Sequence, residues 1–334
     1  MSHHYKAGAP TPWQRLVRML HLERVTINYI FVYAGLIGLI GLTLPLGITA
    51  VYNLLSNGAM YSSTYILIVV VIIGVLVAGI LLIGQLSLVE TIEQKIFTKA
   101  SIEFAYRLPR IKLSELKNEN PPELVNRFFD IITIQKGLAK LLVDIVAAIV
   151  QIIFSAVLLS FYHPVLIGFG VLTILFVSLI LAIYYRQGLN TSIEESAHKY
   201  NLVAYLEEVA SKLPQYRGSE ATMQEVLHQT DKINANYLRA RNSHFRILKK
   251  FFASSVALRC VLMGGLLLLG SYFVVERQMT LGQFVAAEVI IVQISYAVEK
   301  FLTSLDTIFD MVTGSEKLAA VTDLELDEQN LIHG

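Results

Sequence analysis

Charged residues and cysteines are scarce in this chain of 334 residues. Asp, Glu, Lys and Arg make up 16% of the sequence and hydrophobic residues 54%, whereas charged residues make up about 25% of an ordinary soluble domain. The single cysteine, Cys260, has no partner for a disulfide within the chain. These shortages exclude a soluble enzyme, a disulfide-rich secreted domain and a disordered chain, and they indicate a protein that lies mainly in lipid.

Sequence signatures of nucleotide binding, metal binding and catalysis are also missing. Gly265 and Gly270 have the spacing of a phosphate-binding loop, but Ser271 stands where that loop requires lysine. There is no His-Glu-x-x-His pair and no Gly-x-Ser-x-Gly elbow, and His228 and His244 are expected to be solvated. Basic loop residues alternate with acids, which gives nucleic-acid binding little support. We therefore expect no enzymatic activity, metal or cofactor in this chain, and no nucleic-acid partner.

Long uncharged runs dominate the sequence instead. Val25–Val89 and Ile145–Tyr185 contain no charged residue, and each is far longer than the roughly 20 residues that cross a bilayer as one helix. Asn57-Gly58 and His163-Pro164 are turn signals that divide them, and two further apolar segments meet at Glu276-Arg277-Gln278. The sequence thus predicts an all-α membrane protein with six transmembrane helices, over about 28–55, 64–90, 138–162, 165–185, 251–275 and 281–309.

The basic residues predict the orientation of these spans. Four Lys and Arg precede the first span, nine lie between Lys95 and Lys140, and ten lie between Arg186 and Lys250. Only Arg277 falls in a predicted outer loop. Because basic residues in flanking segments favour the cytoplasmic side, we expect a multi-pass membrane protein with both termini and both long loops in the cytoplasm. A bacterial inner membrane is the expected location.

The two long inner loops have helical patterns. Leu202, Leu206, Val209 and Leu213 follow helical spacing, with a break at Pro214. Half of this second loop, about 30 residues, would extend roughly 45 Å from the membrane as a helix. We therefore expect long cytoplasmic helical extensions. Residues 1–24 are predicted to form an amphipathic helix in the inner interface, the alternative being a solvated leader.

Several short motifs follow one another in a characteristic order. They are Leu44-Pro45-Leu46 late in the first span, Arg107-Leu108-Pro109 and then Glu123–Asp130 in the first loop, Met279–Ala286 at the start of the sixth span, and Gly314–Leu318 after it. With six spans and two long inner loops, the whole chain resembles the six-helix transmembrane domain of an ABC exporter. The resemblance assigns residues 25–313 to the transmembrane domain and 314–334 to a C-terminal linker.

This resemblance implies a function and its partners. In that family two six-helix units pair around a substrate pathway, and each inner loop carries a coupling helix that contacts a nucleotide-binding domain, which holds ATP and Mg²⁺. The implied coupling residues are Arg110, Ile111, Lys112, Leu113, Ser114 and Glu115 in a first segment up to Asn120, and Glu207, Glu208, Val209, Ala210, Ser211, Lys212 and Leu213 in a second. The chain departs from the family pattern at Pro121-Pro122, where glycine is usual.

We therefore expect the translocation subunit of an ATP-driven exporter, as a homodimer or heterodimer. Its motor would be a separate polypeptide, although an isolated domain and a degenerate relative are also open. The alternative function is an ATP-independent membrane scaffold or carrier that reuses the fold. The long inner loops favour the exporter, since a protein without a motor has no need of them.

Acidic residues in the last span are the remaining candidates for a functional site. Glu288, Glu299, Asp306 and Asp310 are spaced by eleven, seven and four residues, which places them within about 40° on one helix face, together with Ser295. Ionisable groups at membrane depth usually face a cavity or a partner. A weaker polar stripe lies on the third span, where Asp144, Gln151 and Ser155 are spaced by seven and four residues, and either pathway lining or pairing would explain it. The candidates for lining the pathway are Glu288, Ser295, Glu299, Gln151 and Ser155.

One alternative applies to Glu299. Arg259 lies at similar depth on the preceding span, so the two side chains are candidates for a buried ion pair. We expect pairing for Glu299 and pathway lining for Glu288.

Overall fold

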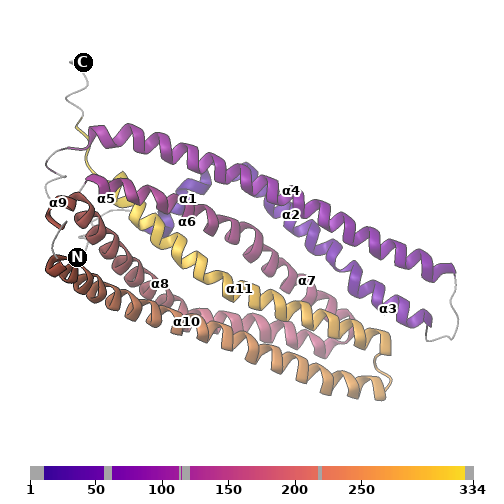
Figure 1. The fold of residues 1–334 in the computed structure, drawn as a ribbon. Coiled ribbons are helices and arrows are strands. Elements are labelled where there is room, and N and C mark those ends of the chain that lie inside the picture. Colours follow the sequence, from indigo (N-terminus) through magenta and orange to yellow (C-terminus); the bar gives the residue numbers. More distant parts are fainter. Residues whose placement is uncertain (1–10, 56–61, 113, 115–120, 217–219, 328–334) are drawn as a thin grey trace.

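A computed structural model describes residues 11–55, 62–112, 114, 121–216 and 220–327. This part of the chain is almost entirely helical, and six of its helices are long and apolar enough to cross a membrane. The six-helix fold predicted from the sequence is therefore confirmed. The long helices run side by side, and α1 and the end of α11 lie at the same end of the bundle as α9 (Figure 1). We call this end the stalk end.

The first span is divided in two. A short helix, α1 (Pro12–His21), precedes α2 (Arg24–Gly41), and α3 (Thr43–Leu55) follows after Leu42. The sequence predicted an uninterrupted span over 28–55, and Pro45 explains the difference. Proline has no N–H to donate and its ring clashes with the carbonyl four residues earlier, which here belongs to Gly41.

The α1 helix is fixed by its own cap and by the bundle. Thr11 and Gln14 form a reciprocal capping box, and Pro12 occupies the first helical turn, where its missing N–H costs nothing. The indole of Trp13 donates a hydrogen bond of 2.7 Å to the hydroxyl of Tyr185. The predicted amphipathic segment is thus a helix that is hydrogen-bonded to the rest of the fold.

Four of the described helices are much longer than a bilayer is thick. They are α4 (Ser62–Arg107), α8 (Ile167–Ser211), α10 (Glu220–Val275) and α11 (Leu281–Thr322). A helix of 46 residues such as α4 extends about 69 Å, against a hydrocarbon core of roughly 30 Å. Their ends beyond the apolar spans are called the stalks here. Proline marks both interruptions at the stalk end, in η1 (Leu108–Arg110) and in α9 (Leu213–Tyr216).

The third span is continuous with a series of short elements. These are α5 (Pro121–Asn126), η3 (Arg127–Phe129), α6 (Asp130–Ala139), a π-helical turn η4 (Lys140–Ile145), α7 (Val146–Tyr162) and η5 (Pro164–Leu166). The sequence placed the span itself at 138–162 and predicted a helical extension of the inner loop before it. The π turn widens the helix at the point where the apolar span begins, and such turns often occur at functional sites.

The last helix, α11 (Leu281–Thr322), lies in the centre of the bundle. It contacts α3, α6, α7, α8 and α10, and Ile290, Ile291 and Ile294 are fully buried on it. Two glycines allow close approach: a Cβ at Gly137 would lie 2.3 Å from Cβ of Met311, and one at Gly188 would lie 2.5 Å from the Phe309 ring.

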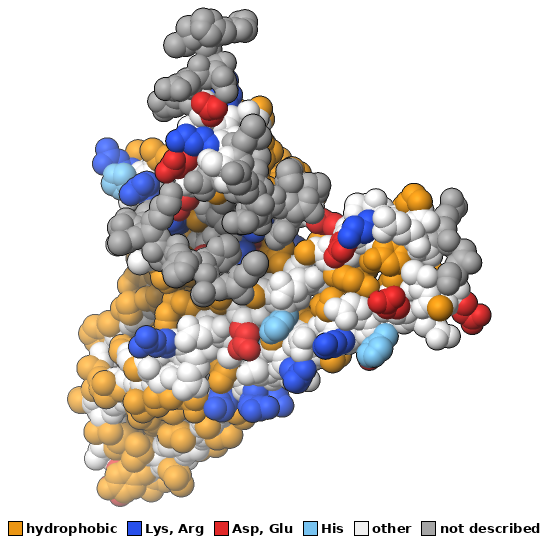
Figure 2. Space-filling model, turned by 90° about the vertical axis from the view of Figure 1, so that its left-hand side faces the viewer, with side chains coloured by type: hydrophobic (Ala, Val, Ile, Leu, Met, Phe, Trp, Pro, Cys, Tyr) orange, Lys and Arg blue, Asp and Glu red, His pale blue; other side chains and the backbone are white. Residues whose placement is uncertain are grey.

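The surface divides into an apolar and a charged part. No residue in the most apolar window of α4 is buried within the chain. Seen from the stalk end, basic side chains are spread over the middle and upper part of the view, while its lower left is mostly hydrophobic (Figure 2). The apolar surface is of the kind that lipid or another transmembrane helix covers.

Candidate functional site

Polar side chains in the apolar part of the bundle gather between α7, α10 and α11. We call this set the polar seam: Asp144, Gln151, Ser155, Arg259, Gln293, Glu299 and Lys300. Five of these seven residues were candidates from the sequence as pathway lining or as an ion pair. The structure adds their contacts, which join Asp144 to Lys300, Gln151 to Ser155 and Gln293, and Arg259 to Glu299.

Glu299 is paired with Arg259. The guanidinium of Arg259 on α10 donates to the carboxylate of Glu299 on α11. The guanidinium carbon also lies 4.8 Å from the centre of the Tyr296 ring, a cation–π geometry. About 30% of each charged side chain is exposed, 31% for Arg259 and 29% for Glu299. Glu299 is therefore engaged within its own chain.

Gln151 connects α7 to α11. Its amide nitrogen donates to Oγ of Ser155 at 2.8 Å and to Oε1 of Gln293 at 3.1 Å. Ser155 is fully buried. Gln293 was missed by the sequence reasoning because five residues at 100° each put it about 140° from Glu288, away from the acidic face. No local signal in the sequence marks it.

Asp144 lies in the π turn and holds two lysines. It accepts a hydrogen bond of 2.8 Å from Lys140 on its own helix and one of 2.8 Å from Lys300 on α11. This bridge ties η4 to α11 through charge. Lys300 was not a candidate from the sequence, since its place next to Glu299 gave no indication of a partner on another helix.

The four acids of the predicted face have different surroundings. Asp306 lies 3.1 Å from Nε2 of His244, and Asp310 accepts from Ser192 at 3.2 Å. Among the described residues, Glu288 makes no hydrogen bond or ion pair, and it is only half-buried. Pathway lining by Glu288 stays a prediction. The other three acids are bound to α8 or α10.

Ser295 lies inside the bundle rather than on an open surface. Its side chain is buried and its hydroxyl donates to the carbonyl of Ile291, one turn earlier, at 2.8 Å. Ser155 is also buried, and its hydroxyl accepts the hydrogen bond from Gln151. Neither serine is placed to face a second unit directly.

The expectation that His244 is solvated was wrong, whereas His228 is exposed. The His244 ring is completely buried between helices, with Nδ1 2.8 Å from the hydroxyl of Thr191. The sequence pattern missed this because α10 is charged on its outer face while its inner face packs on α8 and α11. His244 therefore joins three helices.

The second predicted coupling segment forms the end of α8 and the start of α9. Leu206 and Leu213 are 48% and 58% exposed. Lys212 donates to Glu208 at 2.7 Å, and this hydrogen bond raises the pKa of Lys212 above its ordinary value. Glu207 accepts from Asn126, so the tip of α8 touches α5. The remaining predicted residues, Val209, Ala210 and Ser211, complete the last turn of α8.

Two further apolar side chains are exposed nearby on α10. Met223 and Leu227 are 53% and 61% exposed. The sequence showed their helical spacing but did not mark them as contact residues. With Leu206 and Leu213 they make up what we call the tip patch.

The first predicted coupling segment lies partly outside the described residues, which include Arg110, Ile111, Lys112 and Ser114 but not Leu113, Glu115 or the residues up to Asn120. At its start the chain is not helical. Ile111 forms an antiparallel bridge with Leu326. The Lys112 amide donates to Glu325 at 3.0 Å, and the Asp327 amide donates to Arg110 at 2.7 Å.

We call this contact the strap. It fixes the segment after α11 to the end of η1, and an ion pair of 2.9 Å between Lys112 and Glu325 reinforces it. The strap joins two segments more than 200 residues apart, as the bridge from Ile111 to Leu326 shows.

The model of the ABC transporter transmembrane region family matches residues 27–298. No curated protein matches the chain with significance. The matched range begins in α2 and ends in α11, so it includes residues from all six apolar helices. By fold and by this match, the chain belongs to the ABC transporter transmembrane region family and is an integral, multi-pass membrane protein.

Proposed function

We propose that this chain is the translocation subunit of an ATP-driven ABC exporter, which works as a pair of six-helix units and couples to a nucleotide-binding domain through its stalks. The observation that carries the proposal is the tip patch. Four large apolar side chains there are about half exposed or more. Apolar surface left in water costs roughly 25 cal/mol per Å², so such a patch marks a contact with another protein.

Lipid does not cover the tip patch. Leu206 lies 21 residues after Tyr185, the end of the uncharged run, on the continuous helix α8. At 1.5 Å per residue this separation is about 32 Å, more than the bilayer interface extends. Charged residues such as Glu208 and Lys212 lie beside the patch, as in the polar rim of a protein interface.

The surroundings of Glu288 support pairing of two units. A carboxylate at membrane depth needs water or a partner, and no described residue of this chain provides one. A hydrated pathway between two units would provide the water. The pathway is therefore assigned to the side of α11 that carries Glu288.

ATP hydrolysis belongs to the partner in this proposal. The sequence contains no phosphate-binding loop, so ATP and Mg²⁺ are assigned to the nucleotide-binding domain and none to this chain. Stalks, strap and both termini would then lie in the cytoplasm, as the distribution of basic residues indicates.

The tip patch offers a direct test. The chain is co-purified with a nucleotide-binding protein sought in the neighbouring reading frame, and ATP hydrolysis by the complex is measured in lipid. Replacing Leu206 and Leu213 with Asp removes two apolar contacts worth about 2 kcal/mol each and should abolish co-purification. The matched control is Leu238→Asp on α10. This leucine is 48% exposed, like Leu206, but lies further from the tip.

The proposal makes opposite predictions for the isolated chain and for the complex. Alone, the chain should show no ATPase activity and no photolabelling by an azido-ATP that ATP competes away. With the partner, hydrolysis should depend on the tip patch. Substrate movement that continues without ATP would contradict the exporter and indicate the ATP-independent carrier instead.

A further inference from the structure

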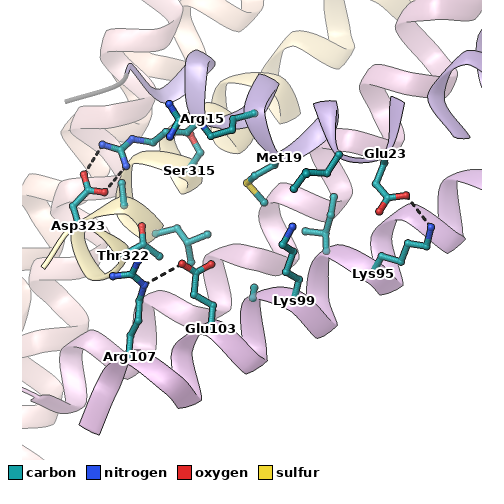
Figure 3. A pocket seen from close by; sticks show the side chains of 16 residues that line it. Arg15, Met19, Glu23, Lys95, Lys99, Glu103, Arg107, Ser315, Thr322 and Asp323 are labelled. Atoms are coloured by element: carbon teal, nitrogen blue, oxygen red, sulfur yellow. Dashed lines mark hydrogen bonds and ion pairs between the residues drawn. The ribbon is translucent and has the colours of Figure 1, made fainter. Parts of the chain in front are cut away.

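A cavity of about 410 Å³ lies at the stalk end, between α1, α4 and the end of α11. Figure 3 shows Met19 of α1, Lys99 of α4 and Thr322 of α11 around it. Its walls are partly apolar, with Met19, Leu22 and Leu318 among the lining residues. The cavity therefore offers an apolar surface beside a charged one.

The charged lining is not balanced. Three acids line the cavity, and each is held by a basic residue: Asp323 by Arg15 at 2.5 Å, Glu23 by Lys95 at 2.8 Å, and Glu103 by Arg107 at 3.0 Å. These pairs are drawn in Figure 3.

Two more cations line the same cavity. Arg18 comes from α1 and Lys99 from α4, and neither forms an ion pair or hydrogen bond with a described residue. In Figure 3 the Lys99 ammonium points from α4 towards Met19 on α1. The cavity thus keeps two positive charges uncompensated, one on each side. An anion that bridges α1 and α4 would neutralise both.

The cavity lies at the edge of the apolar spans. The ion pair of Lys95 with Glu23 marks the side of the cavity that is nearest the spans. The uncharged run of the first two spans begins at Val25, two residues after Glu23, and ends at Val89, six residues before Lys95. Lys95 and Lys99 follow Val89 by six and ten residues, or about 9 and 15 Å along the helix. Lipid headgroups extend roughly 5 to 7 Å beyond the hydrocarbon on each side, so the cavity begins near headgroup depth at Lys95 and continues beyond it to Lys99.

An apolar route leads from the cavity to the lipid. Leu22 lines the cavity and is exposed, and Val25, three residues further on, is exposed on the first turn of α2. A free anion would use only the basic side of the cavity. A molecule with a phosphate and an acyl chain would use both sides.

We propose that this cavity binds an anionic phospholipid from the leaflet on the stalk side. Its phosphate lies between Arg18 and Lys99, and an acyl chain leaves along Leu22 and Val25. Bound there, the lipid joins α1 to α4 across the cavity that both helices line. The site does not depend on the proposed export function.

Native mass spectrometry of the full chain tests the site. The protein is purified in detergent and titrated with phosphatidylglycerol, with phosphatidylcholine and with glycerol phosphate. We expect phosphatidylglycerol to be retained in preference to phosphatidylcholine. Arg18→Gln with Lys99→Gln should weaken its binding roughly thirtyfold, as expected for two basic contacts with an anionic lipid.

The control variant loses the same net charge, but at two positions away from the cavity. Lys232 and Arg246 on α10 are exposed and have no described partner, so Lys232→Gln with Arg246→Gln removes the same two charges. This variant should retain phosphatidylglycerol like the unmodified chain. A monodisperse elution profile shows that each variant is folded.

A second variant leaves the charges in place. Ala319→Leu fills the cavity from α11 and should also reduce retention of phosphatidylglycerol. Equal retention of both lipids, or a charge variant of the cavity that binds like the control, would overturn the proposal. Binding of glycerol phosphate as tight as that of phosphatidylglycerol would also overturn it, since the ligand would then be a soluble phosphate.

Discussion

Arg259 and Glu299 form an ion pair between α10 and α11 in the apolar part of the bundle, with the guanidinium beside the ring of Tyr296. Taking either charge away leaves the other in a medium of low dielectric constant. Glu299→Gln should therefore lower the free energy of unfolding by up to about 3 kcal/mol. Arg259→Gln should have a similar effect, measured by thermal unfolding in detergent.

A double-mutant cycle tests whether Arg259 and Glu299 stabilise the protein as a pair or independently of each other. Arg259→Gln combined with Glu299→Gln should be milder than the sum of the single changes. Glu276→Gln, at an exposed acid in the turn between α10 and α11, is the control and should leave the melting temperature unchanged. Additive losses would show that the two charges do not interact in the folded protein.

Glu288 and Ser295 share a helix face, but we expect only Glu288 to be accessible to water. In a Cys260→Ala background, Glu288→Cys should react with a membrane-impermeant thiol reagent, because a carboxylate at this depth is expected to face a hydrated pathway. Ser295→Cys should not react, since that side chain is buried within the chain. Equal protection of both positions in every state of the transport cycle would remove Glu288 from the pathway.

The link from Gln151 to Gln293 should contribute little energy. Hydrogen bonds between helices in membranes are worth about 0.6 kcal/mol on average, because the unfolded chain in lipid also finds partners. We expect Gln151→Leu and Gln293→Leu to be coupled by roughly that amount in a double-mutant cycle. A coupling energy near zero would mean that the 3.1 Å contact makes no net contribution.

Gly188 should tolerate no side chain. A Cβ there would lie 2.5 Å from the Phe309 ring, so Gly188→Ala should destabilise the protein by about 1 to 3 kcal/mol, despite the higher helix propensity of alanine. Gly168→Ala on the same helix is the control, since nothing lies within 4 Å of its added carbon. Adding Phe309→Leu should restore part of the stability lost at Gly188. Equal melting temperatures for the two alanine variants would contradict the close approach.

The number of membrane-spanning helices could be predicted because it depends on the lengths of the uncharged runs. An uncharged run such as Val25–Val89 is too long for one span and too apolar for water, so two spans are the only outcome. Pro109 and Pro214 marked the interruptions at the stalk end for a similarly local reason, the missing N–H of proline. The same reason applies to Pro45, which accounts for the break between α2 and α3.

The contacts between helices could not be predicted in the same way. Lys300 contacts Asp144 in the π turn between α6 and α7, and no local pattern in the sequence indicates such a turn. The pair of Glu299 and Arg259 could be predicted because charged residues are rare in apolar spans, and these two opposite charges lie at similar depth on neighbouring spans. Gln293 and the cavity beside Arg18 depend on how α11 is rotated against its neighbours, which hydropathy does not encode.

The strap determines how a pulling force would pass through the molecule. A pull on Asp327 acts on α11 through the covalent chain and on η1 and α4 through the strap, whose hydrogen bonds would be loaded together. The pair of Arg15 with Asp323 adds α1 to the same connection. Force applied to the segment after α11 would therefore reach α1 and α4 as well as α11, and it would be passed on to α8 and α10 through the side chains that pack them against α11.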